Sequence, residues 1–174
     1  QGIVVDIGCD CTDFAVVSGG QIINGCTMYY AGKQLTELII ERIKQKYQIQ
    51  LSFEAAEHLK CHGASLYPND TTVVTVAGQN FRHNVRETVN ISSRELYDTL
   101  VEFVGKYIKV IQSLLSSAPD NLSSLLKTDG VMLCGGGAFL AGLDIYLQGE
   151  LGVPVRVAAR PDEVSVTGML KRRS

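Results

Sequence analysis

The first thirty residues alternate short apolar runs with glycine-containing turns. Runs at residues 3–7 and 14–17, rich in β-branched side chains, are typical of buried strands. A third run at residues 21–30 follows the turn at Ser18-Gly19-Gly20. Because short turns join three consecutive strands, we expect an antiparallel meander.

Helical periodicity replaces this alternation after Gly32. Apolar side chains recur three and four residues apart through residues 35–47, which predicts a helix with Thr36 or the residues near Gly32 as its cap. Ser52 begins a second helix, with an acid in its first turn, and this helix runs to Gly63.

A hairpin and a long helix are predicted next. Residues 71–76 form a β-rich run, residues 77–80 a turn, and residues 81–89 the returning strand. The motif Ser92-Ser93-Arg94-Glu95 is a helix start, and an apolar stripe continues from it for about six turns before Pro119.

The last third alternates strand and helix. A buried strand at residues 130–134 ends in Gly135-Gly136-Gly137, and a helix is expected to open directly after the glycines. Residues 153–157 form another strand, and Thr167-Gly168 lie in a last short helix. Strands followed by alternating strand and helix predict a mixed α/β sheet covered by helices.

The first turn carries the clearest candidate chemistry. The first strand ends on Asp6, Gly8 permits a tight turn whose amides can face an anion, and Thr12 adds a hydroxyl. An acid beside such a loop suits a hydrated magnesium ion on a nucleotide phosphate. The alternative is a simple β-hairpin whose tip needs glycine for its geometry.

Two further features each allow a functional and a structural interpretation. The triple glycine at residues 135–137 would let a ligand approach the backbone at a helix start, or it forms a tight strand-to-helix corner. Glu57 and Lys60 stand three residues apart on one helix face, where an exposed ion pair contributes only tenths of a kcal/mol.

Composition narrows the class of protein. The 174 residues carry a formal net charge of −2, which argues against a general nucleic-acid binder. The basic cluster Lys171-Arg172-Arg173 is a solvated end or a contact for acidic lipid or an acidic partner. Five cysteines, an odd count, fit reduced thiols better than a metal site at Cys9-x-Cys11. No apolar run approaches the roughly 20 residues that span a bilayer.

The glycine stretches and helix starts together resemble the actin-like ATPase superfamily, and within it the MreB-like bacterial actins. The resemblance covers nearly the whole chain. Its motifs, in family order, are Asp6-Ile7-Gly8 through Thr12-Asp13, Ala31-Gly32, Ala56-Glu57-His58-Leu59-Lys60, Ile91-Ser92-Ser93-Arg94-Glu95, Gly135 to Leu143, and Val153-Pro154-Val155 with Thr167-Gly168.

The resemblance implies a ribonuclease-H-like mixed sheet flanked by helices. Residues 1–32 and 91–174 would form this core, and residues 33–90 an inserted, smaller α+β subdomain. It is a resemblance to the second half of such a protein. The start of the chain, where Gln1-Gly2 lead straight into a strand, also suggests a piece of a larger protein.

The resemblance also implies ATP or ADP with Mg²⁺ as ligand. Asp6 would hold Mg²⁺ through water. The phosphates would meet a loop made of Gly8, Cys9, Asp10, Cys11 and Thr12. The adenosine would be bordered by Glu57, Lys60, Gly135, Gly136, Gly137 and Phe139.

The implied function is a filament-forming, ATP-binding cytoskeletal protein that helps determine cell shape. It would self-associate, work with other cytoskeletal or cell-wall machinery, and reside in the cytoplasm, including the inner face of the membrane. ATP hydrolysis would need the family's first half, which brings a second phosphate loop and the group that orients water, so this chain alone would be inactive.

Three positions depart from the family pattern. Cys9 and Asp10 stand where these actins carry small residues, mostly glycine, and Lys33 where they carry an acid. A degenerate actin-fold scaffold or adaptor without ATP hydrolysis is therefore an alternative. A small-molecule kinase of the same superfamily is a third hypothesis, although no sugar-binding residues are evident.

Overall fold

The protein, seen in a computed structural model that describes residues 1–164, divides into two compact units. The first unit comprises Gln1–Gly32, Gly105–Phe139 and residues 143–164. The second unit comprises Lys33–Val104 and Leu140–Gly142. The division into residues 33–90 and the remainder, expected from the sequence, stays a prediction.

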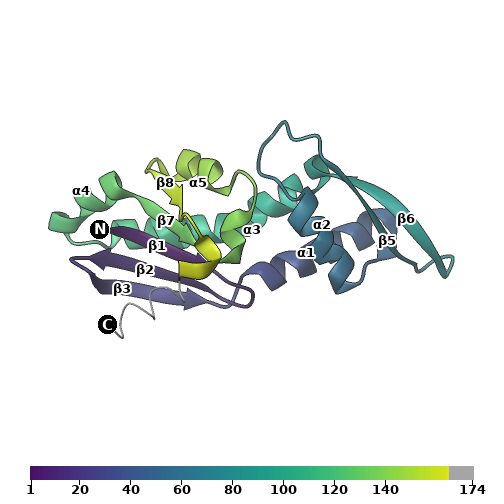
Figure 1. The fold of residues 1–174 in the computed structure, drawn as a ribbon, viewed down its shortest axis with the longest axis horizontal. Helices are drawn as coiled ribbons and strands as arrows, with labels where there is room; N and C mark the ends of the chain where they lie inside the picture. Colours follow the sequence, from purple (N-terminus) through teal and green to yellow (C-terminus); the bar gives the residue numbers. More distant parts are fainter. Residues whose placement is uncertain (165–174) are drawn as a thin grey trace. The chain divides into compact units, whose positions relative to one another are not determined.

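A five-stranded mixed sheet forms the first unit (Figure 1). The order is β3-β2-β1-β7-β8, in which β1, β2 and β3 are antiparallel neighbours and β1, β7 and β8 are parallel. The predicted meander and mixed sheet are therefore confirmed. The strands are β1 (Gly2–Ile7), β2 (Thr12–Ser18), β3 (Gln21–Met28), β7 (Val131–Cys134) and β8 (Val155–Val157).

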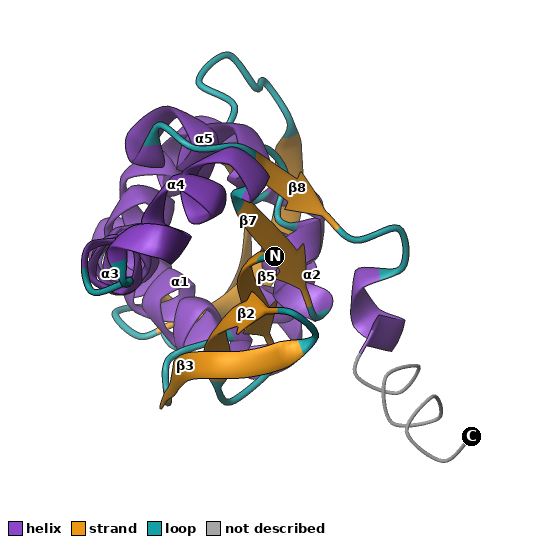
Figure 2. Ribbon diagram, turned by 90° about the vertical axis from the view of Figure 1, so that its left-hand side faces the viewer, coloured by secondary structure: helices purple, strands orange, loops and turns teal. Residues whose placement is uncertain are grey.

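Helices cover one face of this sheet (Figure 2). They are the C-terminal half of α3 (Ser93–Ser116), α4 (Asp120–Asp129) and α5 (Leu143–Leu151). Alternate strand residues supply the core because successive side chains point to opposite faces. Those buried are Ile3, Val5, Ile7, Phe14, Val16, Val131, Leu133 and Val155. None of the helices within residues 1–164 is long and apolar enough to cross a bilayer.

The chain after β7 differs from the sequence prediction. A short 3₁₀ helix, η1 (Gly136–Phe139), follows the strand, and the α-helix α5 begins only at Leu143. A second 3₁₀ helix, η2 (Pro161–Glu163), follows β8. The predicted helix at Thr167-Gly168 and the basic cluster Lys171-Arg172-Arg173 lie outside the described residues.

The second unit packs helices against a small antiparallel sheet of order β4-β5-β6. Ser52 caps α2 as predicted, since its hydroxyl accepts from the Ala55 amide at 3.2 Å. Thr36 is not a cap: it lies inside α1 and is fully buried. The elements are α1 (Gly32–Tyr47), β4 (Ile49–Gln50), α2 (Phe53–Gly63), β5 (Val73–Asn80) and β6 (Val85–Ser92).

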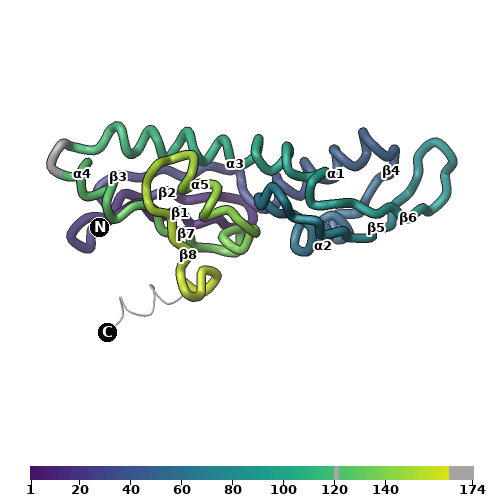
Figure 3. The backbone as a smooth tube through the Cα atoms, turned by 90° about the horizontal axis from the view of Figure 1, so that it is seen from above, coloured from purple at the N-terminus to yellow at the C-terminus, as the bar shows by residue number. Residues whose placement is uncertain are grey.

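The predicted hairpin turn at residues 77–80 is wrong. These residues continue β5, and the turn that joins β5 to β6 lies at residues 81–84 (Figure 3). There the side-chain oxygen of Asn80 accepts from the Arg82 and His83 amides. Gly78 lies within strand β5 and not in a turn. A Cβ on Gly78 would lie 2.6 Å from the Gln50 carbonyl oxygen, so its glycine lets β4 pair closely with β5.

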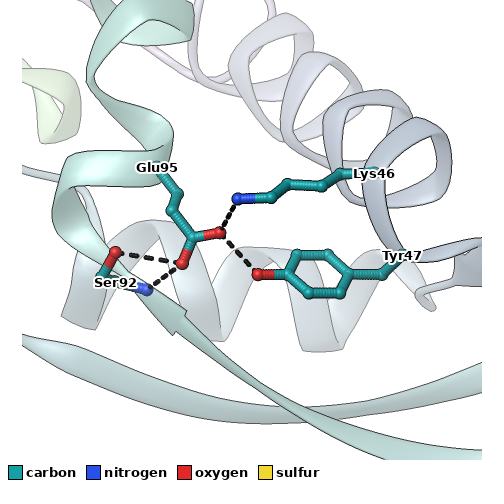
Figure 4. A network of polar contacts seen from close by, with 4 residues as sticks. All are labelled: Lys46, Tyr47, Ser92 and Glu95. Carbon is teal, nitrogen blue, oxygen red and sulfur yellow. Dashed lines mark hydrogen bonds and ion pairs between the residues drawn. The ribbon is translucent and has the colours of Figure 1, made fainter.

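Glu95 forms a polar cluster with the end of α1 (Figure 4). One carboxylate oxygen accepts from the amide and hydroxyl of Ser92, both at 3.0 Å. The other accepts from Lys46 and, at 2.5 Å, from the Tyr47 hydroxyl. The sequence predicts a helix start at Ser92, and the bond from the Ser92 amide to Glu95 is one of the two hydrogen bonds of a capping box. The contacts of Glu95 with Lys46 and Tyr47 connect this helix start to α1.

Candidate functional site

The loop between β1 and β2 is held at its base by Gly8. The Gly8 amide donates to the Cys11 carbonyl at 3.0 Å, and the Gly8 carbonyl accepts from the Gly32 amide at 3.1 Å. A Cβ on Gly8 would lie 3.0 Å from the Cys11 oxygen. Gly8 therefore closes the turn, and its own amide is engaged within the protein.

The tip of this loop is exposed. Cys9 and Asp10 are solvent-exposed, and Cys11 is half-buried. Within residues 1–164, no hydrogen bond engages the backbone amides of Cys9 and Asp10. These two amides are available to an anion, and the Asp10 carboxylate adds a negative charge beside them.

The end of β1, from which this loop starts, lies beside the segment that follows β7. Parallel pairing sets Asp6, near the end of β1, opposite Cys134 at the end of β7. Burial raises the pKa of the Cys134 thiol, and the negative charge of Asp6 raises it further. Ligands in α/β proteins bind outside the carboxyl ends of parallel strands, which is the edge where these residues lie.

The three glycines after β7 have different environments. A Cβ on Gly135 would lie 2.7 Å from the Ile7 carbonyl carbon, and one on Gly137 would lie 2.8 Å from the Ile7 Cβ. A Cβ on Gly136 would meet no atom within 4 Å. Two of the glycines are therefore explained by packing against β1, and Gly136 faces open space. Phe139 ends this segment with 64% of its surface exposed.

Thr12 does not present its hydroxyl to a ligand in this structure. Thr12 is fully buried, and its hydroxyl donates to the Tyr30 carbonyl at 2.9 Å. The Tyr107 hydroxyl lies 3.1 Å from the Thr12 hydroxyl and 3.1 Å from the same carbonyl. Burial raises the pKa of Tyr107 well above its ordinary range. The hydroxyl of Thr12 is therefore engaged within the core in this structure, and the phosphate-binding role expected for Thr12 stays a prediction.

We expect Thr12→Val to destabilise the first unit. Valine matches threonine in shape but leaves the Tyr30 carbonyl and the Tyr107 hydroxyl without this partner, which should lower the free energy of unfolding by about 1–3 kcal/mol. Urea denaturation followed by circular dichroism measures the change. Thr27→Val, which removes an exposed hydroxyl bonded to Asp13, is the control and should change stability little. Equal stability of both variants would contradict the prediction.

The predicted adenosine residues of α2 form a compact cluster in the second unit. The Lys60 ammonium donates to Glu57 at 2.6 Å and to the Thr36 hydroxyl at 2.9 Å, and that hydroxyl donates to Glu57. The Lys60 side chain is only 17% exposed. The pair is therefore a partly buried network rather than the exposed ion pair that the sequence also allowed.

The site residues thus fall into two groups. Asp6, the exposed loop tip and Gly136 gather at one edge of the five-stranded sheet, while Glu57 and Lys60 belong to the second unit. Sequence reasoning missed the role of Tyr107, which falls in the apolar stripe of α3 and carries no motif. Nor did it find the ammonium of Lys106, which lies 3.7 Å from the centroid of the Tyr30 ring.

Comparisons with known proteins identify the family. The family model described as MreB/Mbl protein matches residues 1–173. The cell shape-determining protein Mbl of Bacillus subtilis is 32% identical over 167 residues, which cover 95% of this chain and 50% of Mbl. The chain therefore spans about half the length of the curated relatives that it matches.

Solved structures agree with this assignment. MreB5 of Spiroplasma citri bound to ADP is 25% identical, with a TM-score of 0.93 over 99% of this chain and 53% of MreB5. The MamK double helical filament, at 19% identity, shares the fold with a TM-score of 0.82 over 99% of this chain and 54% of MamK. The expected actin-like fold is confirmed, and the chain belongs to the MreB/Mbl family.

Proposed function

We propose that this chain is the second half of an ATP-binding, filament-forming bacterial actin that helps determine cell shape. The family assignment supports this proposal, because its curated relatives are named cell shape-determining proteins. The alternative function, an actin-fold scaffold or adaptor without ATP hydrolysis, receives no such support. Self-association is proposed because a protein of the same fold, MamK, forms a double helical filament.

One observation carries the nucleotide part of the proposal. Cys9 and Asp10 are exposed residues after the carboxyl end of β1, and no hydrogen bond within residues 1–164 engages their backbone amides. Gly136, which faces open space, follows β7 at the same edge of the sheet. Backbone amides in such a turn bind phosphate oxygens through partial positive charge. MreB5, the relative that was solved with ADP, adds support for a nucleotide as the ligand.

Magnesium fits this arrangement through Asp6. Asp6 is half-exposed near the end of β1, and carboxylates hold Mg²⁺ directly or through its retained waters. A bound Mg²⁺ would neutralise phosphate charge and would also offset the repulsion from Asp10. The roles of Glu57, Lys60 and Phe139 at the adenosine stay predictions, as do contacts with other cytoskeletal proteins.

A thermal-shift titration with Mg-ATP tests the proposal. We compare the native chain with a Cys9→Gly, Asp10→Gly variant, because removing Asp10 removes a charge that repels phosphate. A ligand at ten times its Kd stabilises the folded state by about 1.4 kcal/mol, which a rise in Tm detects. We expect Mg-ATP to raise the Tm of both proteins. The variant should need a lower nucleotide concentration than the native chain for the same rise.

Matched controls separate nucleotide binding from nonspecific effects. Asp98→Gly removes an exposed acid of α3 and should leave the nucleotide response unchanged. Asp6→Asn should reduce the gain that Mg²⁺ adds to ATP alone. The proposal fails if millimolar Mg-ATP stabilises neither the native chain nor the double variant.

A further inference from the structure

Two exposed histidines lie one turn apart on α2. His58 and His62 are four residues apart, so their side chains project from the same helix face. Their rings lie with centroids 4.3 Å apart and planes tilted by 32°. The two imidazoles are thus already close together and open to solvent.

The hydrogen bond of His62 leaves one ring nitrogen free to act as a ligand. His62 Nδ1 lies 2.9 Å from the His58 carbonyl oxygen. A carbonyl can only accept, so Nδ1 carries the hydrogen and Nε2 of the neutral ring keeps a lone pair. Metal-binding histidines commonly use this pattern, in which a carbonyl fixes the tautomer and orients the ring.

We propose that His58 and His62 form a bidentate site for a first-row transition-metal ion such as Ni²⁺, Cu²⁺ or Zn²⁺. Imidazole nitrogen suits these ions, and water would complete the coordination. The site is a two-ligand chelate, since residues 1–164 contain no group of three or more candidate ligands. The proposal does not rest on the proposed nucleotide function, because its ligands His58 and His62 are not among the residues assigned to the nucleotide.

Calorimetric titration with NiCl₂ tests the site. The protein carries no affinity tag, and serine replaces the exposed cysteines Cys9, Cys26 and Cys61, so that thiols do not compete. We expect one ion per chain. His58→Ala and His62→Ala should each weaken binding about tenfold or more, because a single imidazole remains.

The remaining histidine provides a matched control. His83 lies in the β5–β6 turn and is exposed, so His83→Ala should bind Ni²⁺ like the parent. An ion that bridges one turn should also stabilise α2. We therefore expect Ni²⁺ to raise the Tm of the parent and of His83→Ala, but not the Tm of His58→Ala or His62→Ala. Equal Ni²⁺ affinity in all three variants, or loss of binding in His83→Ala, would overturn the proposal.

Discussion

Gly135→Ala is expected to destabilise the first unit by about 3 kcal/mol or more. Gly135 adopts φ 78°, a left-handed conformation that costs a residue with a Cβ about 1–2 kcal/mol. The new methyl group would also press on the Asp6 carboxylate and on the Ile7 backbone. Because the Ile7 backbone cannot retreat without shifting β1, the strand end and the loop that follows it should move.

Gly136→Ala is the matched control for this prediction. Its methyl group would enter open space, so the free energy of unfolding should change by about 0.5 kcal/mol or less. Urea denaturation of both variants gives the comparison. Under the proposed function, Gly136→Ala should weaken nucleotide binding without loss of stability. A Gly135→Ala protein as stable as Gly136→Ala would contradict the account of this corner.

Glu95→Gln is expected to lower the free energy of unfolding by about 1–3 kcal/mol at neutral pH. Burial of Glu95 favours its neutral form, but hydrogen bonds from Lys46, Ser92 and Tyr47 outweigh it and lower the pKa from 4.5 to about 2. Glutamine keeps an acceptor for Ser92 but removes the charge that Lys46 faces. The same contact raises the pKa of Lys46 and of Tyr47.

The depressed pKa of Glu95 also sets a pH dependence. The folded state binds this proton less readily than the unfolded state, so the stabilisation is complete above about pH 4.5 and is lost as the pH falls through 2. The loss amounts to up to about 3 kcal/mol. Urea titrations between pH 7 and 2 should show a shallower acid decline in Glu95→Gln than in the native chain.

Glu102→Gln controls for the removal of a charge from α3. Glu102 is exposed on the same helix and takes part in none of these contacts, so its variant should keep the native stability and acid decline. If Glu95→Gln and Glu102→Gln behaved alike, the cluster around Glu95 would contribute nothing to the fold.

Most of the fold follows from local sequence signals. Periodicity finds α1, Ser52 marks the start of α2, and Ser92 with Glu95 marks the start of α3. The error at Gly78 shows the limit of such reasoning. Residues 77–80 have the composition of a turn. The strand β4 that pairs with β5 there is only two residues long, so it shows no alternation of apolar and polar residues that would predict it.

The candidate site was less predictable because its decisive contacts are distant in the chain. The Thr12 hydroxyl belongs to a motif, yet its partner Tyr107 lies 95 residues away. Nothing local in the sequence reveals that a Cβ on Gly135 or Gly137 would meet Ile7. The positions of the β1–β2 loop and of the glycines at the sheet edge were predictable from the sequence. The direction in which the Thr12 hydroxyl points, and the atoms that pack against Gly135 and Gly137, were not.

The buried thiol of Cys134 makes the β1–β7 corner measurable by its alkylation kinetics. A thiol reacts as thiolate, and both burial and Asp6 disfavour that form, so iodoacetamide should modify Cys134 far more slowly than the exposed Cys9, Cys26 and Cys61. Reaction at Cys134 then requires the corner to open. Mass spectrometry of the modified peptides would report how often this edge of the sheet opens.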